Sequence, residues 1–173
     1  MRLFLAIELD EATKDKLAQA ADALRQCSVR GNFTRRENFH LTLVFLGETD
    51  RAAAVRKAMH EVQMAPFTLC IRGSGVFKRS GGDICWAGVQ KDPALMDLYS
   101  SLFNALLTQG FRPENRPYTP HLTLGREVVL RKDAGDLPQL AEMHVKVNAI
   151  TLMRSDRIQG KLTYTPVYRQ MLK

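Results

Sequence analysis

The tetrapeptide His-Leu-Thr-Leu occurs twice in this chain, at His40–Leu43 and again at His121–Leu124. In a β-strand, alternate residues point to the same face of the sheet. Each copy would therefore place a histidine beside a threonine on one face and turn its two leucines into a core. If two such strands face each other, two imidazoles and two hydroxyls converge on one small anion. This pattern predicts acid–base chemistry on a phosphate group.

The alternative interpretation is two ordinary amphipathic strands whose histidines and threonines only face water. For this composition, a chance repeat with leucine at all four alternate positions has a probability on the order of one in 10⁵. A motif match is a hypothesis until its structural context is known. The repeat therefore favours a functional site without establishing one.

The regularity extends beyond the tetrapeptides. In each half of the chain, a predicted strand and then a predicted helix lead into the motif at matched spacing, which indicates two similar lobes related by a pseudo-twofold axis. The first helix has its apolar residues on one stripe. The second has Asp92 as its N-cap and ends at Gly110. These strands and helices are predicted at Arg2–Leu9, Asp10–Cys27, Ile84–Val89 and Pro93–Gln109.

The remaining elements are predicted more coarsely. Asp50 is the expected N-cap of a helix, and the three prolines of the segment before the second motif make it a rigid loop. A glycine-rich connection and a C-terminal hairpin complete the prediction. The segments concerned are a helix at Arg51–Gln63, a strand at Phe67–Arg72, the connection Gly73–Gly82, the loop Phe111–Pro120, and strands at His144–Arg154 and Leu162–Tyr168 joined across Ser155–Gly160.

The length of 173 residues suits one domain, residues 1–173, with a sizeable core. No run is long and apolar enough for a membrane span, and no signal peptide is recognisable. Cys27, Cys70 and Cys85 are odd in number and form no CxxC pair. We therefore expect reduced thiols in a cytoplasmic protein, without a disulfide framework or a zinc knuckle.

The formal net charge of +7 indicates a polyanionic partner such as nucleic acid. Attraction of this kind provides affinity without sequence preference and weakens with salt. An ordinary solvated basic surface is the alternative. The basic residues concerned lie near the motifs and in loops: Arg30, Arg35, Arg36, Lys78, Arg79, Arg112, Arg116, Arg126, Arg154, Arg157 and Lys161.

A histidine pair can supply a general base and a general acid together, because an unperturbed imidazole titrates at about pH 6.5. The fitting reaction is displacement at phosphorus, with attacking and leaving oxygens roughly in line. The hydroxyls of Thr42 and Thr123 can bond the charged non-bridging oxygens. Glu37 and Glu48 are isolated and flank only one motif, so we expect no metal ion and no cofactor.

Two stretches, Asn38–Gly47 (NFHLTLVFLG) and Pro120–Arg126 (PHLTLGR), resemble the paired HxTx motifs of the two-histidine (2H) phosphoesterases. Within that superfamily the chain is similar to the bacterial RNA 2′,3′-cyclic phosphodiesterases, also called 2′–5′ RNA ligases. The similarity extends from the opening RLFLAIEL to the closing Tyr164–Pro166. It implies an α+β fold in which two antiparallel β-sheet lobes surround a central cleft, with helices outside.

The resemblance also implies a reaction and roles for residues. The reaction is hydrolysis of an RNA 2′,3′-cyclic phosphate to a 2′-phosphomonoester, with a weak reversible capacity to join 2′–5′ RNA ends. His40 would donate a proton to the departing 3′-oxygen, and His121 would accept the proton of the attacking water. Thr42 and Thr123 match the phosphate-binding positions. The pseudo-symmetry makes the two histidine roles exchangeable on physical grounds.

Arg126 is a conditional member of the site. Strict alternation puts it on the face opposite His121, so it reaches the phosphate only if Gly125 ends or bulges the strand. Tyr118 and Phe45 could stack a base but are interpreted as packing residues. Two further histidines, His60 in a helix and His144 at a strand start, are left out of the site.

Two other functions stay open on the sequence. A non-catalytic RNA-binding module would use the basic surface but would give the two motifs no role. A sister enzyme would hydrolyse small cyclic phosphates or remove 3′ nucleotides from RNA. The expected partner is RNA with a terminal cyclic phosphate, bound by a monomer, with no membrane and no protein partner implied.

Overall fold

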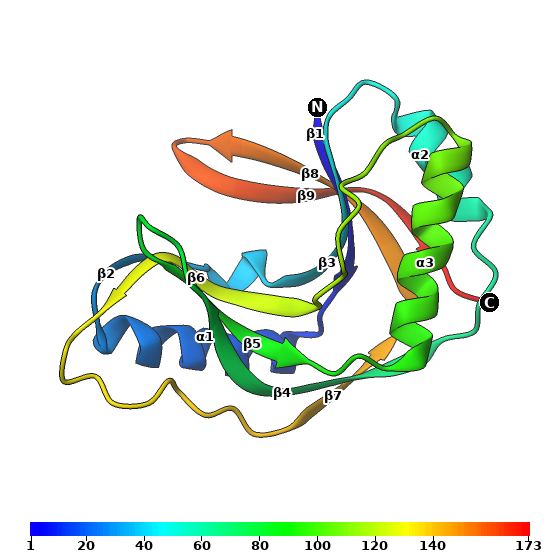
Figure 1. Ribbon diagram of the computed structural model, residues 1–173. Helices are drawn as coiled ribbons and strands as arrows, with labels where there is room; N and C mark the ends of the chain where they lie inside the picture. Colours follow the sequence, from blue (N-terminus) through cyan, green and yellow to red (C-terminus); the bar gives the residue numbers. More distant parts are fainter.

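The computed structural model describes residues 1–173, which form two antiparallel sheets with helices packed on them (Figure 1). The four-stranded sheet has the order β3 (His40–Glu48), β1 (Arg2–Glu8), β8 (Ala149–Ile158), β9 (Lys161–Met171). The five-stranded sheet has the order β2 (Ser28–Phe33), β6 (His121–Leu130), β5 (Asp83–Val89), β4 (Phe67–Phe77), β7 (Met143–Val147). The helices are α1 (Glu11–Gln26), α2 (Ala52–His60), α3 (Pro93–Thr108) and a 3₁₀ turn, η1 (Arg36–Asn38).

The two sheets are built alike around the motif strands. β3 pairs antiparallel with β1, and β6 pairs antiparallel with β5. In each sheet, the motif strand therefore lies beside a strand that comes earlier in the chain, with a long helix between the two in sequence. Each helix then covers the opposite sheet: α1 follows β1 but packs on β2 and β6, and α3 follows β5 but packs on β3. The predicted α+β fold of two pseudo-symmetric antiparallel lobes is confirmed.

Alternation along the strands puts one apolar face of each sheet into a shared core. Leu3, Leu5 and Ile7 on β1 are almost fully buried, as are Leu41 and Leu122 on the motif strands. These residues belong to one cluster that also includes the apolar faces of the three helices. The polar faces of β3 and β6 are consequently left available for a site. No helix is both long and apolar enough to cross a bilayer.

Side-chain caps fix the ends of the two long helices. Asp10 accepts a hydrogen bond of 2.7 Å from the main-chain N–H of Thr13, and Asp92 accepts one of 2.8 Å from Ala94. Gly110, with φ of +84°, ends the second helix in the left-handed region, where glycine carries no Cβ penalty. The predicted cap at Asp92 and the stop at Gly110 are confirmed.

The prediction that Asp50 is the N-cap of α2 is wrong. The N-cap position of α2 is occupied by Arg51 without a side-chain hydrogen bond, and Asp50 lies outside it. The helix is also shorter than predicted. Packing determines its extent: Val55, Ala58 and Met59 are fully buried, and the chain leaves the helix after this apolar stripe ends.

β4 continues through half of the segment expected to be a glycine-rich connection. Gly75 pairs with Trp86 of β5, and a Cβ at Gly75 would lie 2.3 Å from the indole ring. Glycine is therefore required here by the close approach of an aromatic side chain rather than by a turn. The connection itself is reduced to the short turn between Phe77 and Asp83.

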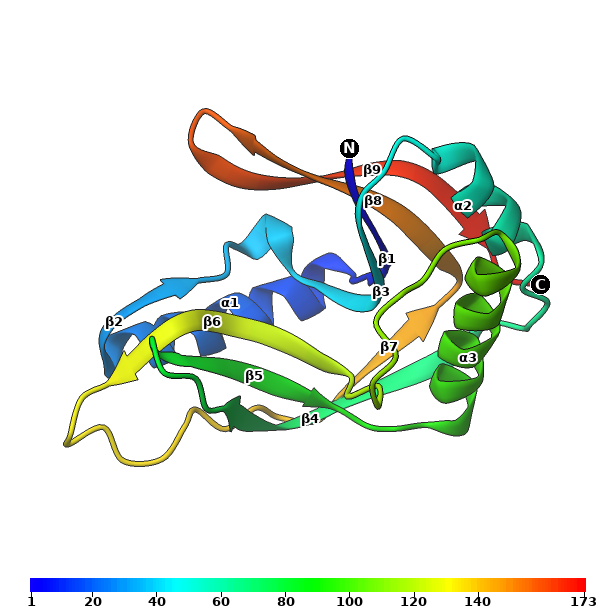
Figure 2. The same ribbon diagram turned by 45° about the horizontal axis from the view of Figure 1, so that its top comes forward.

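Two further predictions needed correction near the ends of the sheets, and one strand was not predicted. The strand expected at His144–Arg154 is two strands, because the chain passes from the five-stranded to the four-stranded sheet at Asn148. The C-terminal hairpin is longer than predicted and turns only at Gln159–Gly160, where both residues have positive φ. Ser28–Phe33, for which no strand was predicted, pairs with β6 as β2. Figures 1 and 2 show the β8–β9 hairpin extending beyond its own sheet.

Candidate active site

The two motifs begin β3 and β6, which lie against each other although they belong to different sheets. In both strands the histidine and threonine are partly exposed and the leucines are buried, as alternation predicts. The same sequence of partly exposed and buried positions holds through the sixth residue of each strand. The chain therefore presents His40 with Thr42, and His121 with Thr123, from two equivalent positions.

Both imidazoles are oriented by the same local hydrogen bond. His40 Nδ1 donates to the main-chain oxygen of Asn38 at 2.7 Å, and His121 Nδ1 donates to that of Thr119 at 2.7 Å. Because a carbonyl oxygen can only accept, Nδ1 must carry the hydrogen in each ring. Nε2 is left for chemistry in both cases, and His40 Nε2 lies 2.9 Å from the Thr42 hydroxyl.

Aromatic side chains enclose each imidazole. The His40 ring lies 4.9 Å from that of Phe4 and 4.9 Å, edge-on, from that of Tyr164. The His121 ring lies 5.0 Å, edge-on, from that of Phe77. Trp86 is further from His121, with ring centroids 6.4 Å apart, and its indole N–H is buried without a partner.

Sequence reasoning did not assign these four aromatic residues to the site. Tyr164 lies in the closing stretch that carried the resemblance, and Phe4 and Trp86 lie on the strands that pair with the motif strands. The available signal was one aromatic residue on each predicted strand that leads, through a helix, into a motif. Which of two adjacent residues faces the histidine depends on register, which the sequence did not fix.

Burial lowers the pKa of both histidines. For His40 the loss of solvent is the largest cause and outweighs the hydrogen bond to Asn38, so its pKa falls to about 4. For His121 burial is again the largest cause, and the charges of Arg126 and Arg116 lower its pKa further. The charge of Arg126 also acts on His40. Both imidazoles are therefore neutral in the free protein at pH 7.

A bulge brings Arg126 to the histidine face. Trp86 pairs with Thr123 but its neighbour Cys85 pairs with Gly125, so one residue of β6 is extra at this point. The bulge reverses the alternation, and Arg126 is exposed with its charge reaching both His40 and His121. The geometric condition on Arg126 is met, and its role toward phosphate stays a prediction.

β3 has a bulge at the equivalent place. Ala6 pairs with Thr42 and Leu5 with Val44, so the residue after the motif threonine is again extra. The position equivalent to Arg126 is then Phe45, which is 49% exposed and lies 4.9 Å beneath the Arg2 guanidinium. The interpretation of Phe45 as a packing residue is wrong. A charge and an aromatic face thus occupy equivalent positions in the two lobes.

The other aromatic and histidine predictions agree with the structure. Tyr118 is largely buried, with its ring stacked on Tyr99 at 4.3 Å, so it packs as expected. His60 is an exposed residue of α2 whose Nε2 lies 2.9 Å from the Tyr168 hydroxyl. His144 is exposed on β7, away from the motif strands. Neither histidine joins His40 and His121.

Many of the basic residues singled out in the sequence are neutralised by carboxylates. Ion pairs join Arg35 to Glu37, Arg36 to Glu11 and Asp15, Lys78 to Asp83, Arg116 to Glu114, and Arg154 to Asp156. The remaining six are not in these pairs: Arg30, Arg79, Arg112, Arg126, Arg157 and Lys161. Among the residues singled out, the charge without a carboxylate partner therefore lies on β2, on β6, at the end of the β8–β9 hairpin, in the β4–β5 turn and in the segment after α3.

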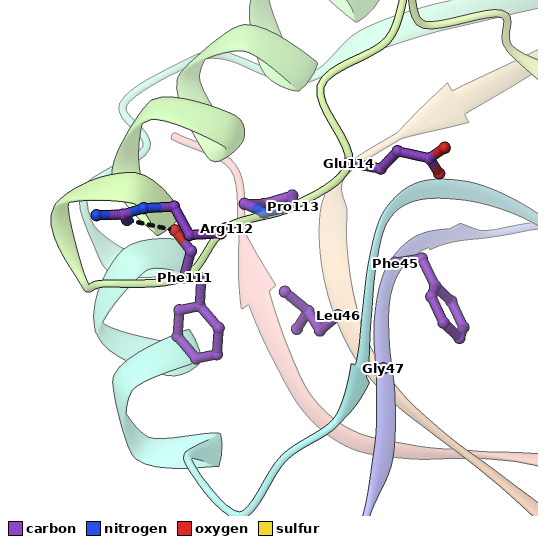
Figure 3. Close-up of a pocket in the computed structure, with 7 residues that line it drawn as sticks. All are labelled: Phe45, Leu46, Gly47, Phe111, Arg112, Pro113 and Glu114. Atoms are coloured by element: carbon purple, nitrogen blue, oxygen red, sulfur yellow. Dashed lines mark hydrogen bonds between the residues drawn. The ribbon is translucent and has the colours of Figure 1, made fainter.

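A separate pocket of about 210 Å³ lies between β3 and the segment that follows α3 (Figure 3). Phe45, Leu46 and Gly47 line one side. The other side is formed by Phe111–Glu114, where Arg112 donates a hydrogen bond of 2.7 Å to the Phe111 carbonyl. Neither motif histidine lines this pocket, so it adjoins the site only through Phe45.

Comparison with known proteins identifies the family. The RNA 2′,3′-cyclic phosphodiesterase of Methanothermobacter thermautotrophicus is 32% identical over 178 aligned positions, covering 95% of this chain and 95% of the relative. That of Escherichia coli is 29% identical and covers 99% and 96%. The crystal structure of E. coli LigT in apo form gives a TM-score of 0.82 at 28% identity, covering 99% and 96%. The sequence profile of the 2′-5′ RNA ligase superfamily matches residues 13–159. This chain therefore belongs to the 2′-5′ RNA ligase superfamily, as its paired motifs had indicated.

Proposed function

We propose that this protein hydrolyses RNA 2′,3′-cyclic phosphate termini to 2′-phosphomonoesters by general acid–base catalysis without a metal ion. The observation that carries the proposal is the matched pair of imidazoles on β3 and β6, each held through Nδ1 by a main-chain oxygen and both within reach of the Arg126 charge. Relatives named RNA 2′,3′-cyclic phosphodiesterase, aligned over nearly the whole chain, support the substrate class.

In the proposed reaction the cyclic phosphate lies between the two rings. His121 Nε2 takes a proton from water, the water oxygen forms a bond to phosphorus, and the bond from phosphorus to the 3′-oxygen breaks. His40 Nε2 gives its proton to that oxygen, which leaves as the 3′-hydroxyl. Thr42, Thr123 and Arg126 stabilise the charge that develops on the non-bridging oxygens.

This mechanism needs one of the two histidines to be protonated. In the protein without substrate, burial of the rings disfavours the protonated form. The low pKa of His40, about 4, means that a proton on this ring must be stabilised by the bound phosphate. An anion beside an imidazolium favours the charged form and raises its pKa. The bound phosphate would thus stabilise the protonated imidazole that catalysis needs. The two histidines would share this proton as a coupled pair.

Metal independence is supported by the two carboxylates that flank the first motif in the sequence. Glu37 is bound to Arg35 at 2.7 Å, and Glu48 lies 3.4 Å from the N-terminal amine. A two-metal phosphodiesterase needs several carboxylates converging on one point. We propose that hydrolysis proceeds without a cofactor, and that reversible 2′–5′ joining of RNA ends occurs at the same site.

RNA rather than a small cyclic phosphate is the proposed partner because charge and stacking surface extend beyond the histidines. Phe45 offers an exposed aromatic face next to Arg2, and bases stack readily on such faces. Arg30 and Arg157 carry charge that no carboxylate compensates. We propose that residues 1–173 act as one monomeric domain in the cytoplasm, where free thiols at Cys27, Cys70 and Cys85 persist.

The test is turnover of a defined oligonucleotide ending in a 2′,3′-cyclic phosphate, in buffer containing EDTA, with the product identified as the 2′- or 3′-phosphate. The proposal predicts a 2′-phosphate, undiminished turnover in EDTA, and losses of about 10²-fold or more in kcat for His40→Ala and His121→Ala. His60→Ala is the matched control. Loss of activity in EDTA would overturn metal independence, and faster turnover of a cyclic mononucleotide would favour the small-substrate alternative.

A further inference from the structure

A second group of chemically reactive side chains lies on the five-stranded sheet, two strands away from the motif strand β6. Cys70 of β4 is paired in register with His144 of the edge strand β7. Residues paired in register point to the same face, so the thiol and the imidazole lie side by side. Glu142, immediately before β7, completes the group. The proposed phosphodiester chemistry uses none of the three.

The three donor atoms are already close together. Cys70 Sγ donates a hydrogen bond of 3.0 Å to Glu142 Oε1, and His144 Nε2 lies 3.9 Å from the same oxygen. All three donor atoms lie within 4.8 Å of one another. Zinc binds sulfur at about 2.3 Å and nitrogen or oxygen at about 2.0–2.2 Å, which places tetrahedral ligands roughly 3.3–3.8 Å apart. Small side-chain rotations bring this group to that spacing.

We propose that Cys70, Glu142 and His144 form a binding site for a thiophilic divalent cation, with Zn²⁺ as the preferred ion. The ligand types select it: thiolate and imidazole favour zinc and its late-transition neighbours, whereas Mg²⁺ and Ca²⁺ require oxygen ligands. Cys70 is 9% exposed, but the Glu142 and His144 side chains are 51% and 63% exposed. An ion can therefore reach the thiol from solvent, and water occupies the fourth position.

The bound ion would act as a clasp. β7 is the edge strand of its sheet and is held by β4 alone. Glu142 closes the irregular segment between β6 and β7, so an ion held by all three residues fastens that segment and β7 to β4. Binding to the folded state alone stabilises a protein by mass action. The site is independent of the histidine pair, so the clasp stabilises the chain and leaves turnover in EDTA intact.

One neighbour acts against cation binding. The charge of Arg72 reaches both Cys70 and Glu142. A positive group beside a cation site weakens it by Coulomb repulsion. Arg72→Gln is therefore expected to tighten binding several-fold, an effect that a purely structural role of the cluster would not produce.

The experiment is a Co²⁺ titration of the reduced full-length protein, followed by the sulfur-to-cobalt charge-transfer absorption, with Zn²⁺ added as competitor. We expect one Co²⁺ per chain, displaced by Zn²⁺, and a rise in Tm of about 5–10 °C at a Zn²⁺ concentration 100 times the Kd. Cys70→Ser retains a hydroxyl that can bond Glu142, so it should fold and lose the absorption. Cys27→Ser is the matched control and should keep it.

His144→Gln and Glu142→Gln should each weaken binding by about tenfold or more, with the charge-transfer band still present at saturation. The proposal is overturned if no charge-transfer band appears, or if the band survives in Cys70→Ser. Activity in EDTA is measured in parallel. A protein that fails to bind Co²⁺ but hydrolyses the cyclic phosphate would contradict only the clasp, and a protein that binds Co²⁺ but shows no turnover would contradict only the proposed function.

Discussion

Tyr118 donates a hydrogen bond of 2.7 Å from its hydroxyl to the main-chain oxygen of Thr42. Tyr118 precedes β6, whereas Thr42 lies on β3 in the other sheet. The reciprocal bond is also present: the Thr34 hydroxyl, from the segment leading to β3, donates to the main-chain oxygen of Thr123 at 2.8 Å. Each motif threonine is therefore tied to the segment that leads into the other motif. These two bonds fix the relative position of the two imidazoles.

Replacing Tyr118 with Phe should loosen this connection while keeping the stack on Tyr99. The carbonyl of Thr42 would lose a partner in a partly buried place, at a cost of about 1–2 kcal/mol in the free energy of unfolding. A small displacement of one imidazole should lower kcat by about tenfold. Urea denaturation and steady-state kinetics check both values, with Tyr99→Phe as control. Unchanged kcat in Tyr118→Phe would show that the bond does not position the site.

Arg126→Gln should change the pH dependence as well as the rate. The charge of Arg126 lowers the pKa of both His40 and His121, so its removal raises both. Both limbs of the kcat/KM profile should then move to higher pH, and kcat should fall by about 10²–10³-fold as a phosphate contact is lost. Arg116 acts on His121 only, so Arg116→Gln should move one limb. Identical pH profiles for wild type and Arg126→Gln would contradict the claim that the Arg126 charge lowers the pKa of both histidines.

A substrate with sulfur in place of the 3′-bridging oxygen separates the two histidine roles. A thiolate leaves without a proton, so the general acid becomes dispensable. If His40 is the donor, His40→Ala should lose less than about tenfold on this substrate, against 10²-fold or more on the oxygen substrate. His121→Ala should be impaired on both. The reverse pattern would exchange the roles, an outcome that the more strongly lowered pKa of His40 makes worth testing.

The buried state of His40 should make stability depend on pH. Its pKa is about 4 in the folded protein and about 6.5 when unfolded, so between these values only the unfolded chain binds the proton. The His40 contribution is complete above pH 6.5 and is lost as pH falls to 4, by about 3 kcal/mol. Urea denaturation across this range should show a smaller decrease for His40→Gln. An equal decrease in both proteins would contradict the assigned pKa.

The repeat and the capping residues predicted much of this architecture because both are local properties. The alternation of His40 with Leu41 and the cap at Asp92 depend on neighbours within a few residues. Sequence patterns of this kind are also sufficient to indicate the superfamily. The motif strands, the two long helices and the pseudo-twofold arrangement were accordingly predictable.

The parts that sequence missed depend on contacts between distant residues. β2 forms because it pairs with β6 at the edge of the five-stranded sheet. The segment predicted as one strand, His144–Arg154, divides at Asn148 because its first part belongs to the five-stranded sheet and its second part to the four-stranded sheet. The bulge that turns Arg126 toward the histidines could not be predicted from the sequence, which gave it only as the condition for Arg126 to reach the phosphate. Gly125 favours it, since a Cβ there would lie 2.9 Å from Val128. Register and pairing, rather than residue type, determined these features.

The central claim is that His40 and His121 act on one phosphate, and histidine NMR tests it most directly. A 2′-phosphorylated dinucleotide, the product of the proposed reaction, is titrated into protein labelled at histidine Cε1, and the pKa of each ring is followed. The account predicts that the signals of both rings follow a single binding curve and that both pKa values rise, while the signals of His60 and His144 do not move when the dinucleotide is added. A response from only one of the two, or two separate binding curves, would contradict it.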